Sequence, residues 1–311
     1  MNADTKAPLA FQVGGHAGVS TSEDGSLLIK PALTREVDFY QHLTSNPVFA
    51  PLRPYIPRFY GTLRFEGKLE DGNLHGGSEE RKDKFLENLS HGFSKPNILD
   101  IKLGTKLYGD GAPEDKKARM IERAKDTTSL ETGVRLTGFQ VHDITTGQAV
   151  NTPKSYGRSI KASDLPDGIA RFFPVHSEQS TQGLPKEQLL PVIKAVRQRV
   201  ATIRDTFARL EIRMVGGSFL IIYESDIERV KQGIALLEEE GVEEADYDDE
   251  DEGSEDEDAE NTKPGPPCLV KLIDFAHIGV VDGEGPDEGV LLGMDTTLKL
   301  LDGRIAQIKD S

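Results

Sequence analysis

The 311-residue sequence has few of the residues that support disulfide, thiolate-metal or membrane chemistry. Its one cysteine, Cys268, cannot form a disulfide within the chain, and a single thiolate excludes a cysteine-rich zinc site. The seven histidines show no HExxH pattern, so any metal must be held mainly by oxygen. No apolar run approaches the roughly 20 residues that a transmembrane helix needs. We therefore expect no membrane span, and the polar first residues favour a protein that stays inside the cell.

Two common phosphate-binding signatures are also missing. The sequence contains no GxxxxGK[ST] loop, and its glycine-rich segment at 14–18 does not match GxGxxG. These signatures depend on glycines at fixed positions, where the backbone approaches a phosphate closely. A P-loop or Rossmann-type nucleotide site is therefore excluded.

Acidic residues are in excess, but they are concentrated in one segment. The chain has 37 Lys and Arg against 53 Asp and Glu, and 16 of the acids lie between Glu238 and Glu260, where there is no Lys or Arg. The rest of the chain is balanced, with 37 acids and 37 bases. A tract of this kind cannot bury enough apolar surface to offset its ordering entropy. We predict a disordered acidic loop at 238–265, which is either a solvated insertion or a docking site for a basic partner.

Hydrophobic periodicity divides the rest of the chain into two parts. The first, 1–93, has a strand pattern ending at Lys30, a helix pattern that starts at Thr34 as its N-cap and stops before Pro47, and further strand patterns at 58–65 and 84–89. The second part, 94–311, begins with an apolar strand. Its predicted elements are strands at 96–102, 219–224 and 268–275 and helices at 114–125, 185–210, after Asp226 and at 291–308.

Lys30 and Glu36 form the first candidate pair. Lys30 ends an apolar strand after a turn, and Glu36 begins the next helix. Kinases use a strand lysine to hold nucleotide phosphates and a helix carboxylate to fix its ammonium. The same two residues also fit ordinary surface charges, and the pattern alone does not distinguish the two interpretations.

Asp100 and Lys102 form the second candidate pair. They are two residues apart in an apolar strand pattern, so their side chains point to the same face. Such a pair either faces a polar cavity or forms a structural ion pair. Asp274 follows another apolar strand, and an acid placed there opposite a phosphate-binding lysine suits Mg²⁺, which prefers a few oxygen ligands together with phosphate.

The helix predicted at 114–125 carries three cations on one face. Lys116, Arg119 and Arg123 fall within about 60° of one another at 100° per residue. A solvated face tolerates this arrangement, and a polyanionic ligand would neutralise it. A small polyphosphate and a nucleic acid both fit, but the helix has no aromatic side chains for base stacking, so we expect no direct nucleic-acid binding.

The segment Pro96–Gly104 matches the PxxxDxKxG signature and thereby resembles the inositol polyphosphate kinase family. The resemblance extends over nearly the whole chain. Within the family it is most similar to the multikinases, because the stretch from Gly104 to Tyr156 is compact, whereas the trisphosphate 3-kinases carry a larger insertion there. The other matching segments are Gln12–His16, Arg35–Tyr40, Tyr156–Ser159, Asp167–Gly168, Arg171–Phe173, Ser218–Leu220, Tyr223–Glu224 and Ile273–His277.

The resemblance implies an α+β, two-lobed fold similar to protein kinases, with antiparallel sheets and packed helices, and ATP and Mg²⁺ as cofactors. Lys30 would contact the ATP phosphates, and Glu36 would pair with Lys30. Glu87 to Leu89 would form the hinge that binds adenine through backbone groups, with Asn88 where multikinases often have an acid that holds the ribose.

The same resemblance assigns the remaining site residues. Asp100 would hold the ribose or orient the attacking hydroxyl, and the sequence does not choose between these roles. Lys102 would bridge the transferring phosphate and the substrate. Asp274 would bind Mg²⁺, with Ser218 a further candidate nearby. The inositol phosphates would bind to Lys116, Arg119 and Arg123.

We therefore expect ATP-dependent phosphoryl transfer to hydroxyls of inositol 1,4,5-trisphosphate and a tetrakisphosphate, by a monomer in the nucleus and cytoplasm. Two alternatives stay open. One is a non-catalytic or dual-role nuclear scaffold, or transcription cofactor, whose acidic loop binds a basic nuclear protein. The other is a phosphoinositide lipid kinase, which is disfavoured because no amphipathic membrane helix is recognisable.

Overall fold

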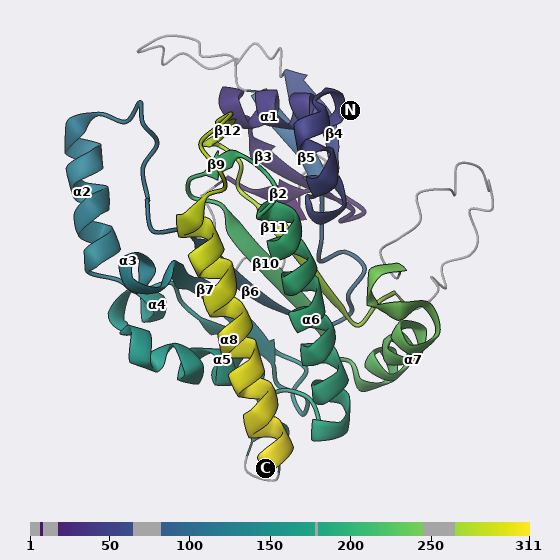
Figure 1. Ribbon diagram of the computed structural model, residues 1–311. Coiled ribbons are helices and arrows are strands. Elements are labelled where there is room, and N and C mark those ends of the chain that lie inside the picture. The colour runs from purple at the N-terminus through teal and green to yellow at the C-terminus, as the bar shows by residue number, and fades with distance from the viewer. Residues whose placement is uncertain (1–6, 9–17, 65–81, 178–179, 245–264) are drawn as a thin grey trace, which may run out of the picture.

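The computed structural model describes residues 7–8, 18–64, 82–177, 180–244 and 265–311 and contains two five-stranded antiparallel sheets (Figure 1). The first sheet has the order β1-β2-β3-β5-β4. Asp24 and Gly25 lie in the turn between β2 and β3, where Gly25 adopts a φ of 78°. Most of the glycine-rich segment, at 14–17, lies outside the described residues. The strands are β1 (Ala7–Pro8), β2 (Ser20–Thr21), β3 (Leu27–Pro31), β4 (Phe59–Arg64) and β5 (Lys82–Glu87).

The helix after β3 packs beside the first sheet, and the 3₁₀ helix that follows it contacts the second sheet. Helix α1 (Thr34–Ser45) ends before Pro47 as predicted, but its N-cap is Leu33, not Thr34, and no side chain caps it. The 3₁₀ helix η1 (Pro47–Tyr55) follows, and its internal prolines are incompatible with a regular α-helix because each lacks an N–H donor. The buried Phe39 ring of α1 stacks on Phe275 from the second half of the chain, with ring centroids 4.6 Å apart.

The second sheet has the order β11-β10-β6-β7-β8 and places the PxxxDxKxG segment at its centre. Strand β6 pairs antiparallel with β10 on one side and β7 on the other. The pairing with β7 is interrupted by a bulge between Asp100 and Ile101. Bulges of this kind re-aim side chains and are frequent beside active sites. The strands are β6 (Pro96–Leu103), β7 (Val134–His142), β8 (Ala149–Thr152), β10 (Ser218–Glu224) and β11 (Cys268–Ile273).

Two long helices, α6 (Lys186–Phe207) and α8 (Glu288–Asp310), run side by side across this sheet, and α2 (Glu114–Lys125) extends away from the body (Figure 1). The predicted stripe of α6 is confirmed, because Leu189, Ile193 and Val196 are fully buried. Sequence periodicity did not predict the shorter elements. They are α3 (Ser129–Thr132), α4 (Tyr156–Ser159), η2 (Ala162–Asp164), α5 (Leu165–Phe172) and the two-stranded sheet of β9 (Ile212–Met214) and β12 (Ile278–Val280).

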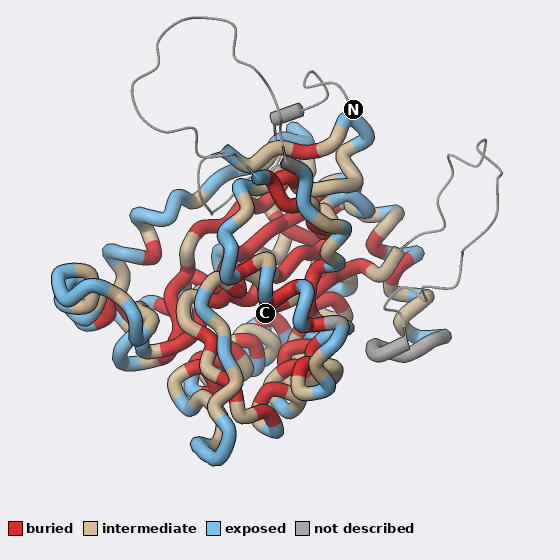
Figure 2. Tube along the Cα trace, turned by 90° about the horizontal axis from the view of Figure 1, so that it is seen from above, coloured by how far each residue is buried: buried red, intermediate tan, exposed pale blue. Residues whose placement is uncertain are grey.

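Buried apolar side chains from both parts of the chain form one main core. Figure 2 colours the buried residues red, and they lie mostly in the interior of the tube. It includes Leu52 of η1, Leu99 of β6 and Ile308 of α8. A smaller cluster joins Leu89 to residues of β6, β10 and β11. The boundary between a lobe at 1–93 and a lobe at 94–311 stays a prediction.

Helix α7 (Ile227–Glu244) corrects the start of the predicted acidic loop. The loop was expected at 238–265, but the helix continues to Glu244. Glutamate is a good helix former, and the apolar face of Val230, Ile234 and Leu237 continues the helical period up to the tract. Asp226 caps the helix as predicted, since its Oδ1 accepts a hydrogen bond from the Arg229 N–H. Residues 245–264 lie outside the described residues.

No helix in the described part of the chain is long and apolar enough to cross a membrane.

Candidate active site

The centre of the candidate site is a charged pair on β6. Asp100 is only 5 % exposed, and its Oδ1 has no hydrogen-bond partner among the described residues. The Lys102 Nζ donates to the Gly216 carbonyl at 2.6 Å, so it is held by a backbone oxygen rather than by a carboxylate. The structure therefore confirms that both side chains are on one face of β6, and it leaves each with unused capacity to bind a ligand.

Burial shifts the pKa values of both groups. The pKa of Asp100 is raised to about 6, first by burial and then by the negative charge of Asp274, while Lys102 acts in the opposite direction. The pKa of Lys102 is lowered, again first by burial, while the charges of Asp100 and Asp274 raise it. Perturbed titrating groups of this kind cluster at functional sites.

Asp274 lies just beyond the end of β11 and connects the two sheets. Its carboxylate is 3.5 Å from the Nζ of Lys30, which is on β3 of the first sheet. Among the described residues it is the one non-glycine residue with a positive φ, at 68°. Backbone strain of this kind persists where the surroundings impose it, often at active sites. The predicted grouping of Lys30, Asp100, Lys102 and Asp274 is thus observed.

Glu36 has a different partner from the one predicted. Its buried carboxylate pairs with Lys84 of β5, not with Lys30. Lys84 lies directly opposite Lys30 in the β3–β5 ladder, so the two lysines are neighbours. Lys84 pairs with Glu36, and Lys30 pairs with Asp274. Burial lowers the pKa of Lys84, and the charge of Glu36 opposes that shift. The sequence showed Lys30 at the end of an apolar strand. Which lysine pairs with Glu36, however, depends on how the strands pair, and the sequence pattern does not give that.

The predicted hinge residues are fixed by hydrogen bonds within the protein. The Asn88 amide nitrogen Nδ2 donates to the Gly25 carbonyl at 2.7 Å, and the Glu87 Oε2 accepts from the Arg58 N–H at 3.1 Å. Leu89 is buried against Ile98 in the smaller apolar cluster. Ile98 precedes Asp100 by two residues, so an apolar surface adjoins the charged pair on the same face of β6. Adenine binding here stays a prediction.

Ser218 and Asp274 are the candidate metal ligands. Ser218 is 1 % exposed and lies directly opposite Lys102 on β10, next to Ile273 on β11. Within the described residues no group of three or more His, Cys, Asp or Glu could hold a metal ion. This donor set fits Mg²⁺ that takes one or two protein oxygens and completes its shell with phosphate and water. It does not fit a metal held by protein ligands alone.

The basic helix is observed as predicted, at Glu114–Lys125. Lys116 and Arg123 are half-buried and Arg119 is exposed, and no ion pair between described residues includes any of the three. Lys116 lies near His277: the pKa of His277 is lowered by burial and then by the Lys116 charge. One end of α2 is therefore next to the segment that carries Asp274.

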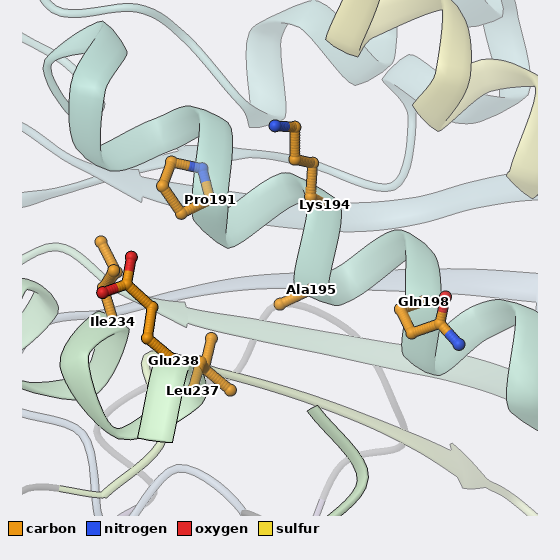
Figure 3. A pocket seen from close by; sticks show the side chains of 7 residues that line it. All are labelled: Pro191, Lys194, Ala195, Gln198, Ile234, Leu237 and Glu238. Carbon is orange, nitrogen blue, oxygen red and sulfur yellow. The ribbon is translucent and has the colours of Figure 1, made fainter. Parts of the chain in front are cut away.

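A groove of about 590 Å³ lies elsewhere, between α6 and α7 (Figure 3). It shares no residue with the site described above, and its single cation gives it no means of binding a polyphosphate. It is not the active site. Its lining residues are Pro191, Lys194, Ala195, Gln198, Ile234, Leu237 and Glu238.

Comparisons with known proteins agree with this geometry. A family model described as "Inositol polyphosphate kinase" matches residues 84–302. The inositol polyphosphate multikinase of Saccharomyces cerevisiae is 30 % identical over 94 % of this chain and 96 % of its own length. Human inositol hexakisphosphate kinase 2 is 28 % identical over 70 % of this chain and 50 % of its own length.

A solved structure shows that the fold of this chain is similar as well as its sequence. The crystal structure of an inositol phosphate multikinase from S. cerevisiae in complex with ADP and Mn²⁺ has a TM-score of 0.67 and 29 % identity, covering 89 % of this chain and 98 % of that one. The family model spans most of the chain, and the α+β fold with antiparallel sheets agrees with the expectation from sequence. The chain belongs to the inositol polyphosphate kinase family.

Proposed function

We propose that the protein is an ATP- and Mg²⁺-dependent inositol polyphosphate multikinase. It phosphorylates inositol 1,4,5-trisphosphate to tetrakis- and pentakisphosphates. The observation that carries the proposal is the grouping of Lys30, Asp100, Lys102 and Asp274 where the two sheets meet, with an unneutralised basic helix beside it.

Phosphoryl transfer depends on positioning and charge neutralisation, and each of the grouped residues has a separate role in it. Lys30 binds nucleotide phosphates, and Lys102 contacts the transferring phosphate, where it stabilises the developing charge. Asp274, with Ser218 nearby, would hold Mg²⁺, which would supply charge neutralisation at the phosphates. The unpartnered Oδ1 of Asp100 accepts a hydrogen bond from a hydroxyl, either of the ribose or of the acceptor.

The α2 cations bind the phosphates of the acceptor. Lys116 lies near the segment after Asp274, and Arg123 lies two helical turns, about 10 Å, further along α2, so the helix can contact more than one phosphate of the same ring. An open basic surface lets the ring bind in more than one orientation, which would expose different hydroxyls to transfer. A single product position from both trisphosphate and tetrakisphosphate acceptors would contradict this last step.

The direct test is incubation with Mg·ATP and inositol 1,4,5-trisphosphate, with products separated by anion exchange. We expect successive tetrakis- and pentakisphosphate peaks that are lost in folded Lys102→Met and Asp274→Asn variants. Arg197→Gln, a surface cation paired with Asp302 on α8, is the matched control and keeps wild-type turnover. No turnover by folded wild-type protein on any inositol phosphate would overturn the proposal.

We also propose that the acidic tract Glu238–Glu260 binds a basic partner, in the nucleus as well as the cytoplasm. Its support is the local excess of 16 acids in an otherwise balanced chain. Deleting 245–260 should leave turnover near normal and abolish salt-sensitive binding to a lysine-rich protein such as histone H1. If the deleted protein bound the lysine-rich protein as wild type does, the tract would be a solvated insertion without a binding role. If the deletion abolished turnover, the tract would be required for catalysis, which would contradict the proposal.

A further inference from the structure

Lys84 of β5 is a buried lysine that the roles above do not use. It lies directly opposite Lys30 in the antiparallel pairing of β3 and β5, so the two side chains share a face of the sheet. Like charges placed directly opposite each other destabilise a sheet. The repulsion is offset here because each lysine has a carboxylate of its own, Glu36 for Lys84 and Asp274 for Lys30.

The two ion pairs differ in their access to a ligand. The side chains of Lys84 and Glu36 are only 2 % and 6 % exposed, whereas those of Lys30 and Asp274 are 21 % and 34 % exposed. The Lys30 Nζ is 3.5 Å from the Asp274 Oδ1, which is longer than a usual N–H···O hydrogen bond of about 2.9 Å. The inner pair is therefore enclosed, and the outer pair is the one that a ligand can reach and separate.

The two pairs form one electrostatic cluster around Lys84. Burial lowers the pKa of Lys84 most, the charge of Glu36 raises it, and the charges of Lys30 and Asp274 then lower and raise it respectively. If Lys84 lost its charge, Glu36 would be left as a buried carboxylate without its partner, which is costly. Lys30, directly opposite, is the cation that would replace it.

We propose that Lys84 is a positioning residue of the nucleotide site, which holds Glu36 and thereby leaves Lys30 able to move from Asp274 to a nucleotide phosphate. The inference deepens the proposed function and rests on it. A diphosphate suits the released ammonium, because its charged oxygens replace the carboxylate that Lys30 gives up. Asp274 is then no longer occupied by a cation of the protein, as a metal ligand requires. The enclosed pair of Lys84 and Glu36 stays intact throughout.

Calorimetric titration with ADP in the presence of Mg²⁺ tests this role, because ADP carries phosphates but allows no turnover. We expect Lys84→Met to weaken ADP binding about ten-fold, since Glu36 would then pair with Lys30 and hold it away from the phosphates. The double variant Glu36→Gln with Lys84→Met should regain most of the affinity, because it has no buried carboxylate to hold Lys30. Lys82→Met, the same substitution at an exposed lysine of β5, is the matched control and should bind ADP as wild type does.

Thermal unfolding and steady-state kinetics separate positioning from a purely structural role. Positioning predicts a raised KM for ATP in Lys84→Met and an unchanged KM for the acceptor. A structural role predicts an ADP affinity that falls in step with the Tm and is not regained in the double variant. Wild-type ADP affinity in folded Lys84→Met, or a double variant that binds as weakly as the single one, would overturn the inference while leaving the kinase intact.

Two further outcomes are also decisive. Wild-type protein that binds no ADP in the presence of Mg²⁺ would refute the proposed function itself. If Lys84→Met does not fold, Lys84→Gln decides the question by the same titration, because it keeps a hydrogen-bond donor beside Glu36 but carries no charge. Weakened ADP binding by Lys84→Gln would support the positioning role, and wild-type affinity would overturn it.

Discussion

Two buried carboxylates in the β6–β10 strand pair, Glu224 and Asp100, differ in how completely they are hydrogen-bonded. At one end, Glu224 lies opposite Pro96 and is 3 % exposed. It accepts hydrogen bonds from the backbone N–H groups of Ser94 at 2.7 Å, Lys95 at 2.9 Å and Ser225 at 2.8 Å. Further along β6, Asp100 is as deeply buried, but its Oδ1 has no donor.

The cations repeat this contrast. Near Glu224, Lys95 pairs with Asp226 at 3.4 Å, and Arg229 donates to the Gly92 carbonyl at 2.7 Å. Near Asp100, within the part of the chain that the structure describes, Lys102 has only a carbonyl partner, and the Nη1 of Arg135, opposite Lys102 on β7, is unpaired. A fully satisfied polar cluster rigidifies a fold, whereas an unsatisfied one carries a cost that a ligand can offset. The first cluster therefore holds the segment after the predicted hinge in place, and the second leaves polar atoms available to a ligand.

The largest expected effect comes from the unsatisfied end. Lys102→Met should lower kcat by on the order of 10³, because it removes the cation that we propose stabilises the transferring phosphate. It should not lower the Tm, since it replaces a buried cation with an apolar chain of similar length. Steady-state kinetics and thermal unfolding measure the two effects. If Lys102→Met lowered both the Tm and kcat, the polar groups near Asp100 would contribute to stability as those near Glu224 do, and the proposed difference between the two clusters would be wrong.

The next effect comes from the satisfied end. Glu224→Gln keeps the size of the side chain but replaces one acceptor oxygen with a donor that faces backbone N–H groups. We expect a loss of about 2–3 kcal/mol in the free energy of unfolding, measured by urea denaturation. The KM for ATP should rise more than the KM for the acceptor, because the held segment follows the hinge. Glu228→Gln, which breaks a surface pair with Lys231, is the control.

The pH dependence of stability in metal-free protein gives a smaller effect. The folded pKa of Asp100 is about 6 against its ordinary value of 3.8, so the folded state holds the proton more tightly than the unfolded state does. The resulting stability is fully present below the unfolded pKa and is lost as pH rises through 6. Between about pH 4 and pH 7, wild type should lose up to roughly 3 kcal/mol relative to Asp100→Asn. Parallel unfolding curves across this range would show that Asp100 does not titrate there.

The smallest effect belongs to a cation paired at the surface. Arg197→Gln breaks an ion pair with Asp302 whose nitrogen and oxygen are 2.9 Å apart and solvent-exposed. We expect a loss of about 0.5 kcal/mol in urea denaturation, because water screens such pairs. If Arg197→Gln lowered the free energy of unfolding as much as Glu224→Gln does, burial would not explain why the Glu224 cluster contributes more to stability than a surface ion pair.

Local patterns predicted the elements that carry most of the site. Each prediction used a local signal: β6 is an apolar run with two charges two residues apart, α2 is a basic segment behind Pro113, and α6 has a single apolar stripe. The partner of Glu36 was predicted wrongly, since it depends on which strand lies beside β3, a tertiary feature that spacing does not contain. Arg135 was not singled out for the same reason: it is an isolated arginine in its own segment, and only the β6–β7 register places it opposite Lys102.

The left-handed backbone at Asp274 limits how an inactive form of this protein can be designed for trapping a complex. A φ of 68° is tolerated by glycine, asparagine and aspartate and disfavours most other side chains. Alanine would therefore combine loss of the carboxylate with a backbone penalty, and glycine would free the chain beside Phe275 in the core. Asparagine keeps both the backbone conformation and one oxygen ligand, so Asp274→Asn removes the charge and the ion pair with Lys30 while it keeps the backbone that places Phe275 against Phe39.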